Sequence, residues 1–309
     1  MKVSVLVLLI LFPCLLLTVT RTVSLDGTEQ YTSIQTAIDA CSNGDIVEVY
    51  PGEYFEHLNT NGRSITIQSR YHITQSETTI NNTIIHSTPQ YSCLKVNTQE
   101  SVTINGFTLM NNYPVDFNYN FNTLAGGAGG IYVRDNSSIN ILNCKITNCI
   151  GWSAGGIYFR GNDFYMSNTQ VFSNYGYNTV GGVYISGSYA DSVVFDNINF
   201  NSVYNNTSWS TMDMLLASLN EPVQVSLHTF SIILTEPDGF FVRCYDNNNI
   251  TFSTQNAYFN IINQDVYVSP NGNDLNSGLS PLEPLKTIVY AVKLIASDSL
   301  NPKTIHLMP

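Results

Sequence analysis

The chain has 309 residues, a formal net charge of −11, and charged side chains at only 11% of its positions. An acidic surface of this kind disfavours nucleic acid and anionic membranes as partners, because both carry negative charge. Neutral or cationic partners remain compatible with it.

The N-terminus has the pattern of a secretory signal peptide. Lys2 supplies a positive charge, Val3 to Leu17 form an apolar run, and small or polar residues follow up to Ser24. The run is too short to span a bilayer comfortably, which argues against a membrane anchor. We therefore assign residues 1–24 to a signal peptide that is cleaved between Thr20 and Ser24, and we expect no other membrane insertion.

A second pattern supports an extracellular location, either secreted or at the cell surface as part of a longer product. Sequons for N-glycosylation occur at Asn81, Asn136, Asn205, Asn206 and Asn249. The chain is rich in Asn, Ser and Thr, so any single sequon also arises by chance. The cysteines outside the signal peptide are odd in number, and their spacing matches no zinc framework. A Cys144–Cys149 disulfide and two unpaired core cysteines are equally compatible with the sequence.

The first element expected after the signal peptide is a short helix. Thr32 and Gln35 have the spacing of a capping box, and apolar residues recur at helical spacing from Ile34 to Cys41. An alternating strand follows at residues 47–50. From there to about residue 206 we expect short strands separated by turn residues, with no further amphipathic helix.

The middle of the chain repeats itself. The segment from Ala128 to Arg134 returns at 154–160 and again at 180–186, so its second glycine recurs every 26 residues, as Gly130, Gly156 and Gly182. A fixed period of this length is typical of a solenoid, in which each unit buries its apolar face only by stacking on its neighbours.

The repeat extends beyond this glycine segment. Residues Asn143 to Ile146 correspond to 168–171 after one deletion, and we take 197–200 to continue the series. Residues 106–109 are a more distant member. Glycine and asparagine at the bends tolerate the left-handed backbone that such turns require.

These features together resemble the pectin lyase-like superfamily of right-handed parallel β-helices. The resemblance is carried by Asp26-Gly27-Thr28, by the segments 31–38 and 47–54, and by the 26-residue repeats. It implies an all-β fold, a right-handed parallel β-helix (solenoid) with a short N-terminal capping helix. We expect one β-helix domain at 25–264, with irregular coils at 207–264, where the glycine pattern is lost.

The last segment, 265–309, repeats the opening of the chain. Asp265 to Asp274 looks like the start of another such domain, and Leu285 to Val292 parallels the helical segment 31–38. We interpret 265–309 as the start of a second, truncated β-helix domain, which makes the chain a fragment of a longer protein. The alternative is that this segment packs on the first domain as a C-terminal cap.

Catalytic motifs of the superfamily's enzymes are missing. The segment from Gly52 to Glu56 fits the G-x-Y-x-E opening of pectin methylesterases, but that motif is mostly structural, and the motifs that carry esterase chemistry are absent. Polygalacturonase motifs are absent too, and Asp191 and Asp196 are more simply solvated turn acids. The sequence contains neither a calcium cluster of the pectate lyase kind nor a metal-spaced histidine pattern. We therefore assign no catalytic residue, metal or cofactor.

The best candidate for a functional surface is the outward face of the repeats. If Ile131 and Val133 point inward, strand alternation sends the residues between and after them outward. The outward residues of three successive repeats are Tyr132, Arg134, Tyr158, Arg160 and Tyr184. Stacked tyrosines pack against sugar rings, and adjacent arginines hold a uronate, sulfate or phosphate group. Alternatively, the tyrosines only stack on one another, and Asp135 or Asp163 neutralises the arginines.

Three functions follow from this sequence. We favour a non-enzymatic secreted or cell-surface protein that binds a polysaccharide or glycoconjugate, or mediates adhesion. The first alternative is a pectin lyase-like carbohydrate-active enzyme, a lyase or hydrolase acting on acidic polysaccharide. The second is a structural fragment with no activity of its own.

Overall fold

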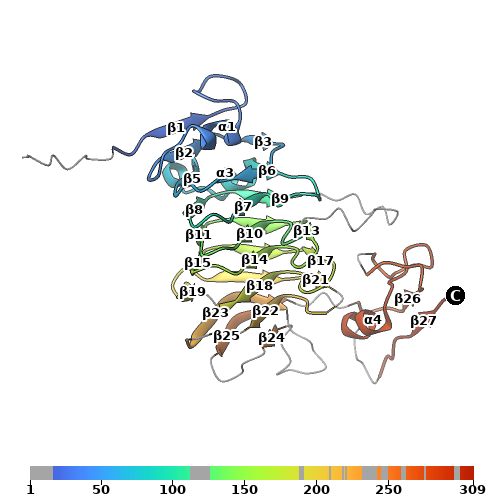
Figure 1. The fold of residues 1–309 in the computed structure, drawn as a ribbon. Coiled ribbons are helices and arrows are strands. Elements are labelled where there is room, and N and C mark those ends of the chain that lie inside the picture. The colour runs from blue at the N-terminus through green and yellow to red at the C-terminus, as the bar shows by residue number, and fades with distance from the viewer. Residues whose placement is uncertain are drawn as a thin grey trace, which may run out of the picture.

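Parallel strands in stacked sheets dominate the structure. The computed structural model of the 309-residue chain describes residues 17–111, 126–187, 191–208, 210–217, 219, 221–231, 242–244, 250–258, 262–274, 276–295 and 300–309. It is 44% strand and 9% helix, and all its sheets are parallel. Figure 1 shows the strands stacked in chain order, with the C-terminal unit beside the stack. The chain is thus all-β, in an arrangement compatible with a β-helix.

Three long sheets run through the stack, and each joins strands of successive repeats. The first sheet consists of β1 (Thr20–Val23), β2 (Ile46–Val49), β5 (Thr66–Ser69), β8 (Ser101–Asn105), β11 (Ser138–Leu142), β15 (Asp163–Ser167) and β19 (Ser192–Phe195). The second consists of β3 (Gly52–Tyr54), β6 (Thr83–His86), β9 (Thr108–Met110), β12 (Lys145–Thr147), β16 (Gln170–Phe172), β20 (Asn201–Tyr204), β23 (Val223–Ser231) and β25 (Ile250–Tyr258). The third consists of β4 (Leu58–Asn59), β7 (Leu94–Val96), β10 (Ile131–Val133), β14 (Ile157–Phe159), β18 (Val183–Ser186), β22 (Met214–Ala217) and β24 (Val242–Cys244).

Shorter elements complete the fold. A small sheet follows the second sheet along the chain and contains β13 (Ile150–Gly151), β17 (Tyr175–Gly176) and β21 (Thr207–Ser208). The C-terminal unit pairs β26 (Val266–Val268) with β27 (Ile305–Leu307). The helices are α1 (Ile34–Asp39), α2 (Tyr71–Thr74), α3 (Glu77–Asn82) and α4 (Ile288–Leu294).

The first strand lies inside the segment that we assigned to the signal peptide. Strand β1 pairs with β2, and Val23 is fully buried. Arg21 forms a salt bridge with Asp45, with 2.7 Å between Nη1 and Oδ2. Residues from Thr20 onward therefore take part in the sheet, and the position of cleavage stays a prediction. Residues 1–16 lie outside the described residues, and the signal peptide itself stays a prediction.

The G-x-Y-x-E segment holds the N-terminus of α1. The Glu56 carboxylate accepts hydrogen bonds from Ser33 Oγ (2.8 Å) and from the N–H groups of Ile34 (2.9 Å) and Gln35 (2.8 Å). A carboxylate at this end satisfies N–H groups that lack partners within the helix. The motif has a structural role in this chain.

The cap of α1 differs from the predicted one by one residue. Ser33, not Thr32, is the N-cap, and its hydroxyl accepts from Thr36 N at 3.2 Å. The Gln35 side chain instead accepts from Asn59 N (2.8 Å) and donates to Asn59 O (3.0 Å). Gln35 thus joins α1 to β4, which a local capping pattern does not reveal.

Two short helices occupy a region where we expected only strands. Helices α2 and α3 have four and six residues, and only Thr79 and Ile80 are buried among them. They show no apolar helical period, so hydrophobic patterning misses them. Ser76 before α3 and Glu77 in its first turn are helix start signals that hydrophobic patterning does not detect.

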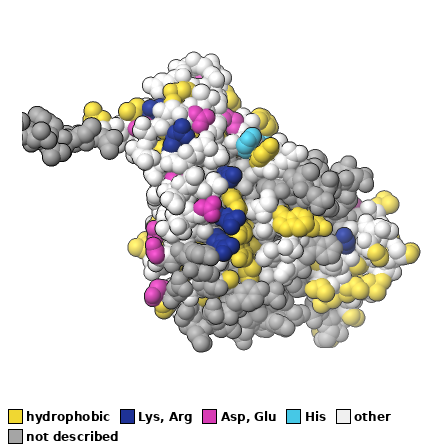
Figure 2. All heavy atoms as spheres, in the orientation of Figure 1, with side chains coloured by type: hydrophobic (Ala, Val, Ile, Leu, Met, Phe, Trp, Pro, Cys, Tyr) yellow, Lys and Arg dark blue, Asp and Glu magenta, His cyan; other side chains and the backbone are white. Residues whose placement is uncertain are grey.

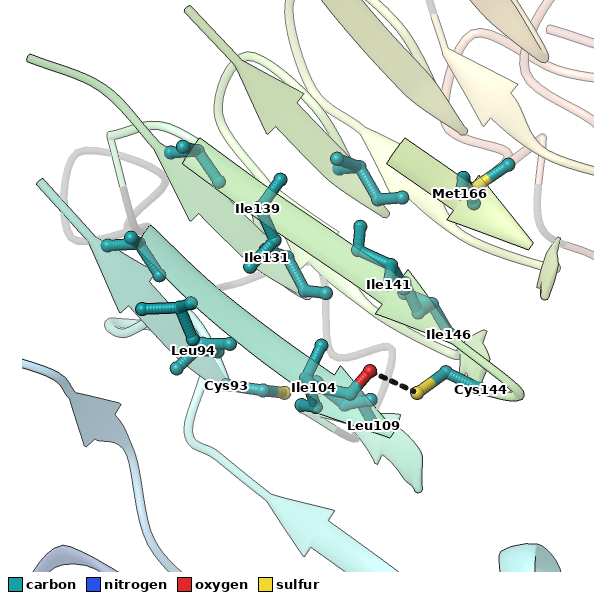
Figure 3. Packing of buried hydrophobic residues seen from close by; sticks show 14 of the residues in the cluster. Cys93, Leu94, Ile104, Leu109, Ile131, Ile139, Ile141, Cys144, Ile146 and Met166 are labelled. Carbon is teal, nitrogen blue, oxygen red and sulfur yellow. Dashed lines mark hydrogen bonds between the residues drawn. The ribbon is translucent and has the colours of Figure 1, made fainter. Parts of the chain in front are cut away.

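Inward side chains of successive strands form the core. Ile104, Ile141 and Met166 lie in register in the first sheet and are fully buried. Figure 3 shows how this column meets side chains from the other two sheets, including Ile131 and Ile146. Burial alternates along β10, since Ile131 and Val133 are fully buried and the residue between them is not. The predicted inward and outward alternation is confirmed.

Strand pairing reproduces the predicted repeat with one correction. Ile131 pairs with Ile157 and Ile157 with Val183, at the 26-residue period, and Lys145 pairs with Gln170 across the predicted deletion. The next member is not 197–200, because Gln170 pairs with Ser202 in β20. The extra residues form a turn in which Ile198 is 81% exposed.

The segment 207–264 continues the sheets with less regular spacing. Strand β22 pairs with β18, and β23 and β25 extend the second sheet with nine-residue strands. The pairing of β20 with β23 shifts register between Asn201 and Ser202. The strands persist although the glycine pattern is lost.

A row of buried polar side chains links the last regular repeats. Asn206 Oδ1 accepts from Asn174 N (3.1 Å) and Asn174 Nδ2 (2.9 Å). Asp213 Oδ1 accepts from Asn206 N (3.0 Å) and Asn206 Nδ2 (2.8 Å) in the same way. Asp213 is fully buried, and burial raises its pKa to about 7 although bonds from Asn206 oppose that rise. The row therefore consists of two asparagine amides followed by one aspartic acid carboxyl group.

Candidate functional site

The outward tyrosines of three repeats form a continuous ladder. Parallel pairing of β10, β14 and β18 places Tyr132 beside Tyr158, and Tyr158 beside Tyr184. The ring centroids are 5.4 Å apart in the first pair, with 28° between planes, and 4.7 Å apart in the second, with 10°. All three rings are partly exposed. The predicted ladder is confirmed as a structural feature.

Small residues of the glycine segment make room for the ladder. The rings pack on a row formed by Ala128, Ala154 and Val180, which lies outside the main core. A Cβ atom on Gly127 would collide with the Tyr132 ring. Gly127 thus leaves room for the first ring, and the row of Ala128, Ala154 and Val180 supports the ladder.

The two arginines lie together beside the ladder. Arg134 and Arg160 line one open cavity of ≈ 240 Å³, which Asp135 and Asn136 also line. Arg134 Nη1 donates to the Tyr132 hydroxyl at 3.1 Å, and this bond raises the pKa of Arg134. Figure 2 shows Lys and Arg side chains in a column beside a strip of hydrophobic side chains. The sequence-based site residues therefore form one contiguous surface.

The third sheet sets the limits of this surface. Lys95 of β7 pairs with Tyr132, which adds a cation to one end of the row. Leu215 of β22 pairs with Tyr184 at the other end, where no aromatic ring follows. The row thus runs from Lys95 through three tyrosines to Leu215.

The acids near the arginines make no close ion pair with Arg134. Among the described residues, no salt bridge joins Arg134 to a carboxylate, although Asp135 lines the same cavity and adds to the rise in the pKa of Arg134. Asp163 Oδ2 accepts from Ser138 Oγ at 2.9 Å. For Arg134, the predicted neutralisation is therefore limited to the field of Asp135.

Acids suited to catalysis do not gather at this surface. Asp196 accepts from Ser167 Oγ (2.7 Å), Tyr165 Oη (3.0 Å) and Ile198 N (2.8 Å). Burial opposes the effect, but these bonds hold its pKa well below the usual range. Within the part of the chain that the structure describes, no three His, Cys, Asp or Glu side chains form a group suited to a metal ion.

The predicted glycosylation sites differ in accessibility. Asn81 and Asn136 are exposed, and Asn205 is partly buried with its amide donating to Ser173 Oγ at 2.9 Å. Asn206 is 2% exposed, and its amide donates to Val171 O at 2.9 Å and to Asp213, so this fold has no room for a glycan there. Asn249 lies outside the described residues. Glycosylation at the accessible positions stays a prediction.

The cysteines of the core are unpaired. Cys41, Cys93, Cys144 and Cys149 are buried and free. Burial raises the pKa of Cys144 to about 12, so its thiol stays protonated and unreactive. A Cys144–Cys149 disulfide is not present in this structure.

Comparisons with known proteins give no relative. No family model matches the chain, and no curated protein matches its sequence. The described helices include none that is long and apolar enough to cross a membrane.

Proposed function

We propose that this chain is a right-handed parallel β-helix protein of the pectin lyase-like type, secreted or displayed at the cell surface. Three observations support this fold. The long sheets join strands in chain order, a row of buried asparagines links successive turns, and α1 packs its apolar face at the N-terminal end. Repeat proteins need such an end cap because the first unit has no neighbour to cover it.

The proposed function is non-enzymatic binding of an acidic polysaccharide or glycoconjugate. The observation that carries it is the juxtaposition of a flat tyrosine ladder with Arg134 and Arg160 in one open cavity. The exposed edges and hydroxyl groups of the stacked tyrosines contact and hydrogen-bond a sugar, and a guanidinium binds a carboxylate or sulfate in bidentate geometry. Because the whole chain is acidic, an anionic ligand is attracted only where cations gather.

The surface lacks the groups that bond cleavage needs. Hydrolysis of a glycosidic bond generally uses two carboxyl groups on either side of the bond. Asp135 is the only acid among the described residues that line the cavity. The proposal is therefore binding without turnover, and cleavage is an outcome that the test below detects.

Retention on immobilised polygalacturonate, compared with a neutral galactan, tests this proposal. We expect the wild type to bind polygalacturonate, and the double variant Arg134→Gln/Arg160→Gln to bind at least about 100-fold more weakly, since each charge-assisted contact contributes about 1.5–3 kcal/mol. Tyr158→Ala should weaken binding about tenfold, because it removes one hydroxyl group that bonds the sugar and interrupts the row of rings between Tyr132 and Tyr184.

Two variants on the second sheet serve as matched controls. Lys145→Gln removes one positive charge from a side chain that contacts Glu77, away from the ladder. Tyr204→Ala interrupts another aromatic stack, in which Phe172 of β16 and Tyr204 of β20 lie 5.2 Å apart at 6°. Both should bind like the wild type. Equal losses in the control and test variants contradict the proposed surface, and release of unsaturated or reducing products contradicts binding without turnover.

A further inference from the structure

Glycine follows asparagine directly at four positions of the chain. These pairs are Asn43-Gly44, Asn61-Gly62, Asn105-Gly106 and Asn271-Gly272. An asparagine in such a pair loses its side-chain amide readily, because glycine has no Cβ to hinder attack of its backbone nitrogen on the preceding side chain. The four pairs are alike in sequence, so only the fold distinguishes the ones that react.

Three of the four glycines use their N–H groups in backbone hydrogen bonds. Gly44 N donates to Ser64 O (2.7 Å), Gly106 N to Leu142 O (3.0 Å) and Gly272 N to Ser269 O (2.8 Å). A nitrogen held in this way reaches the preceding side chain only after its hydrogen bond breaks. The fold therefore protects these three asparagines.

Gly62 differs from the other three glycines. Within the part of the chain that the structure describes, nothing accepts a hydrogen bond from its N–H group. Asn61 and Gly62 are both exposed, and a Cβ on Gly62 would meet only Thr98, at 3.8 Å or more. One hydrogen bond closes the turn around this pair, from Arg63 N to Thr60 O (3.0 Å). The Gly62 nitrogen is thus available, and the turn has room to move.

The turn is attached to the end of the capping helix α1. Asn61 Nδ2 donates to Asp39 Oδ1 at 3.2 Å, and the same oxygen accepts from Gln35 Nε2 at 3.1 Å. Arg63 Nη2 donates to Asp39 O (3.0 Å), and Arg63 Nε donates to Cys41 O (3.1 Å). Since Asp39 is the last residue of α1, a change at Asn61 acts on the C-terminal end of that helix.

We propose that Asn61 is a site of spontaneous deamidation, at which the folded protein acquires a negative charge beside its N-terminal helix. The site shares no residue with the ladder surface, so it stands whether or not that surface binds acidic polysaccharide.

The reaction needs water and no other reactant. The Gly62 nitrogen gives its proton to water or hydroxide and forms a bond to Asn61 Cγ. The Cγ–Nδ2 bond breaks, and the departing nitrogen takes a proton from water and leaves as ammonia. The succinimide ring that results takes up one water molecule at either of its carbonyl carbons and opens to aspartate or isoaspartate. In the net change, a carboxylate replaces an amide.

The new carboxylate should weaken the end of α1. It replaces a donor to Asp39 by a second negative charge, at the C-terminal end of a helix, where negative charge is unfavourable. Arg63 lies 3.8 Å from the Asp39 carboxylate and offsets part of this repulsion. We expect the melting temperature to fall by about 1–4 °C.

Mass spectrometry of the aged protein tests the site. The purified protein is incubated at pH 8 and 37 °C, either folded or in denaturing guanidinium chloride. Digestion with trypsin and Glu-C then places the four asparagines in separate peptides. In the folded protein, Asn61 should gain about 1 Da at least about tenfold faster than the other three asparagines, because their glycine nitrogens are free only after local opening. In guanidinium chloride, the four rates should agree within about threefold, since the fold no longer protects any of them.

Three variants test the effect on α1. Asn61→Asp has the charge of the aspartate product and should melt about 1–4 °C below the wild type. Asn61→Gly is the matched control, because it accepts the left-handed backbone of this position (φ 50°) without adding a charge, and it should melt above Asn61→Asp. Asp39→Asn combined with Asn61→Asp exchanges donor and acceptor and should restore the melting temperature to within about 1 °C of the wild type.

Two results overturn the proposed site. One is equal rates of deamidation at Asn61 and at the other three asparagines in the folded protein. The other is an unmodified Asn61 in the folded protein after the time in which it reacts fully in guanidinium chloride. A melting temperature of Asn61→Asp equal to that of the wild type overturns the proposed effect on α1.

Discussion

The buried carboxyl of Asp213 predicts a stability that falls as the pH rises. Asp213 lies in register with Gly182, since Val183 pairs with Met214. Asp213 accepts a hydrogen bond from Asn206 in the same way as Asn206 accepts one from Asn174. Asp213→Asn preserves the shape and an Oδ1 acceptor for both bonds from Asn206. The substitution therefore removes the ionisable group with little other change.

The expected size of the effect follows from the shifted pKa. Burial raises the pKa of Asp213 from 3.8 to about 7. The folded state keeps the proton to about pH 7, whereas the unfolded chain loses it near pH 3.8. The contribution of the Asp213 proton to the free energy of unfolding is thus fully present below pH 3.8. It declines as the pH rises and is lost above about pH 7. At 1.36 kcal/mol for each pKa unit, the total is about 4 kcal/mol.

Urea unfolding of the wild type and Asp213→Asn between pH 4 and pH 8.5 measures this effect. The free energy of unfolding of the variant, minus that of the wild type, should increase by about 4 kcal/mol across the range. Asp191→Asn removes the same charge from an exposed turn and controls for the net charge of the chain. A difference that stays constant within about 1 kcal/mol refutes a protonated Asp213 in the folded protein.

Three further predictions concern stability and the candidate site. Glu56→Gln should lower the free energy of unfolding by about 1–3 kcal/mol in urea, because three donors at the start of α1 lose a charged acceptor; no loss relative to Glu53→Gln contradicts this role. Gly155→Ala should destabilise by about 1–3 kcal/mol, since its Cβ would meet Tyr175 N at 2.6 Å, whereas Gly126→Ala has nothing within 4 Å and should be neutral in the same assay. In a glycosylating host, Asn136→Gln should remove one glycan by mass spectrometry and raise affinity for polygalacturonate, because Asn136 lines the arginine cavity; an equal rise in Asn81→Gln contradicts local masking.

The ladder surface could be predicted because two short periods define it. Strand alternation decides that Tyr132 and Tyr158 point outward, and the 26-residue period decides that they are neighbours. Both periods can be recognised from short stretches of sequence, because a few residues in each repeat specify them. The register of β20 was mispredicted because turn length varies there, and the extra residues around Ile198 leave no mark on the strand pattern.

The sequence alone did not predict the features that depend on the ends of the stack. Thr20 to Val23 read as the end of a signal peptide, yet their alternation also fits a strand once β2 is present as a partner. The burial of Asp213 depends on the repeats that surround it, because the same Asp in an exposed turn keeps its charge. Hydrophobic patterning records which residue types recur, but not the neighbour that covers each of them.

The N-terminal and C-terminal units have the same local pattern but different surroundings. Comparing them shows which features depend on local sequence and which depend on the stack. Ser24 N donates to Tyr31 O before α1, and Ser269 N donates to Leu285 O before α4, both at 2.9 Å. The hydrogen bonds are thus repeated, but Ile34 of α1 is fully buried and Ile288 of α4 is 50% exposed.

Local residues therefore set the strand and helix, and a stack beneath the helix is needed to bury its apolar face. In the C-terminal unit, the loop 270–274 and Tyr290 instead line a cavity together with Tyr175 and Tyr177 of the stack.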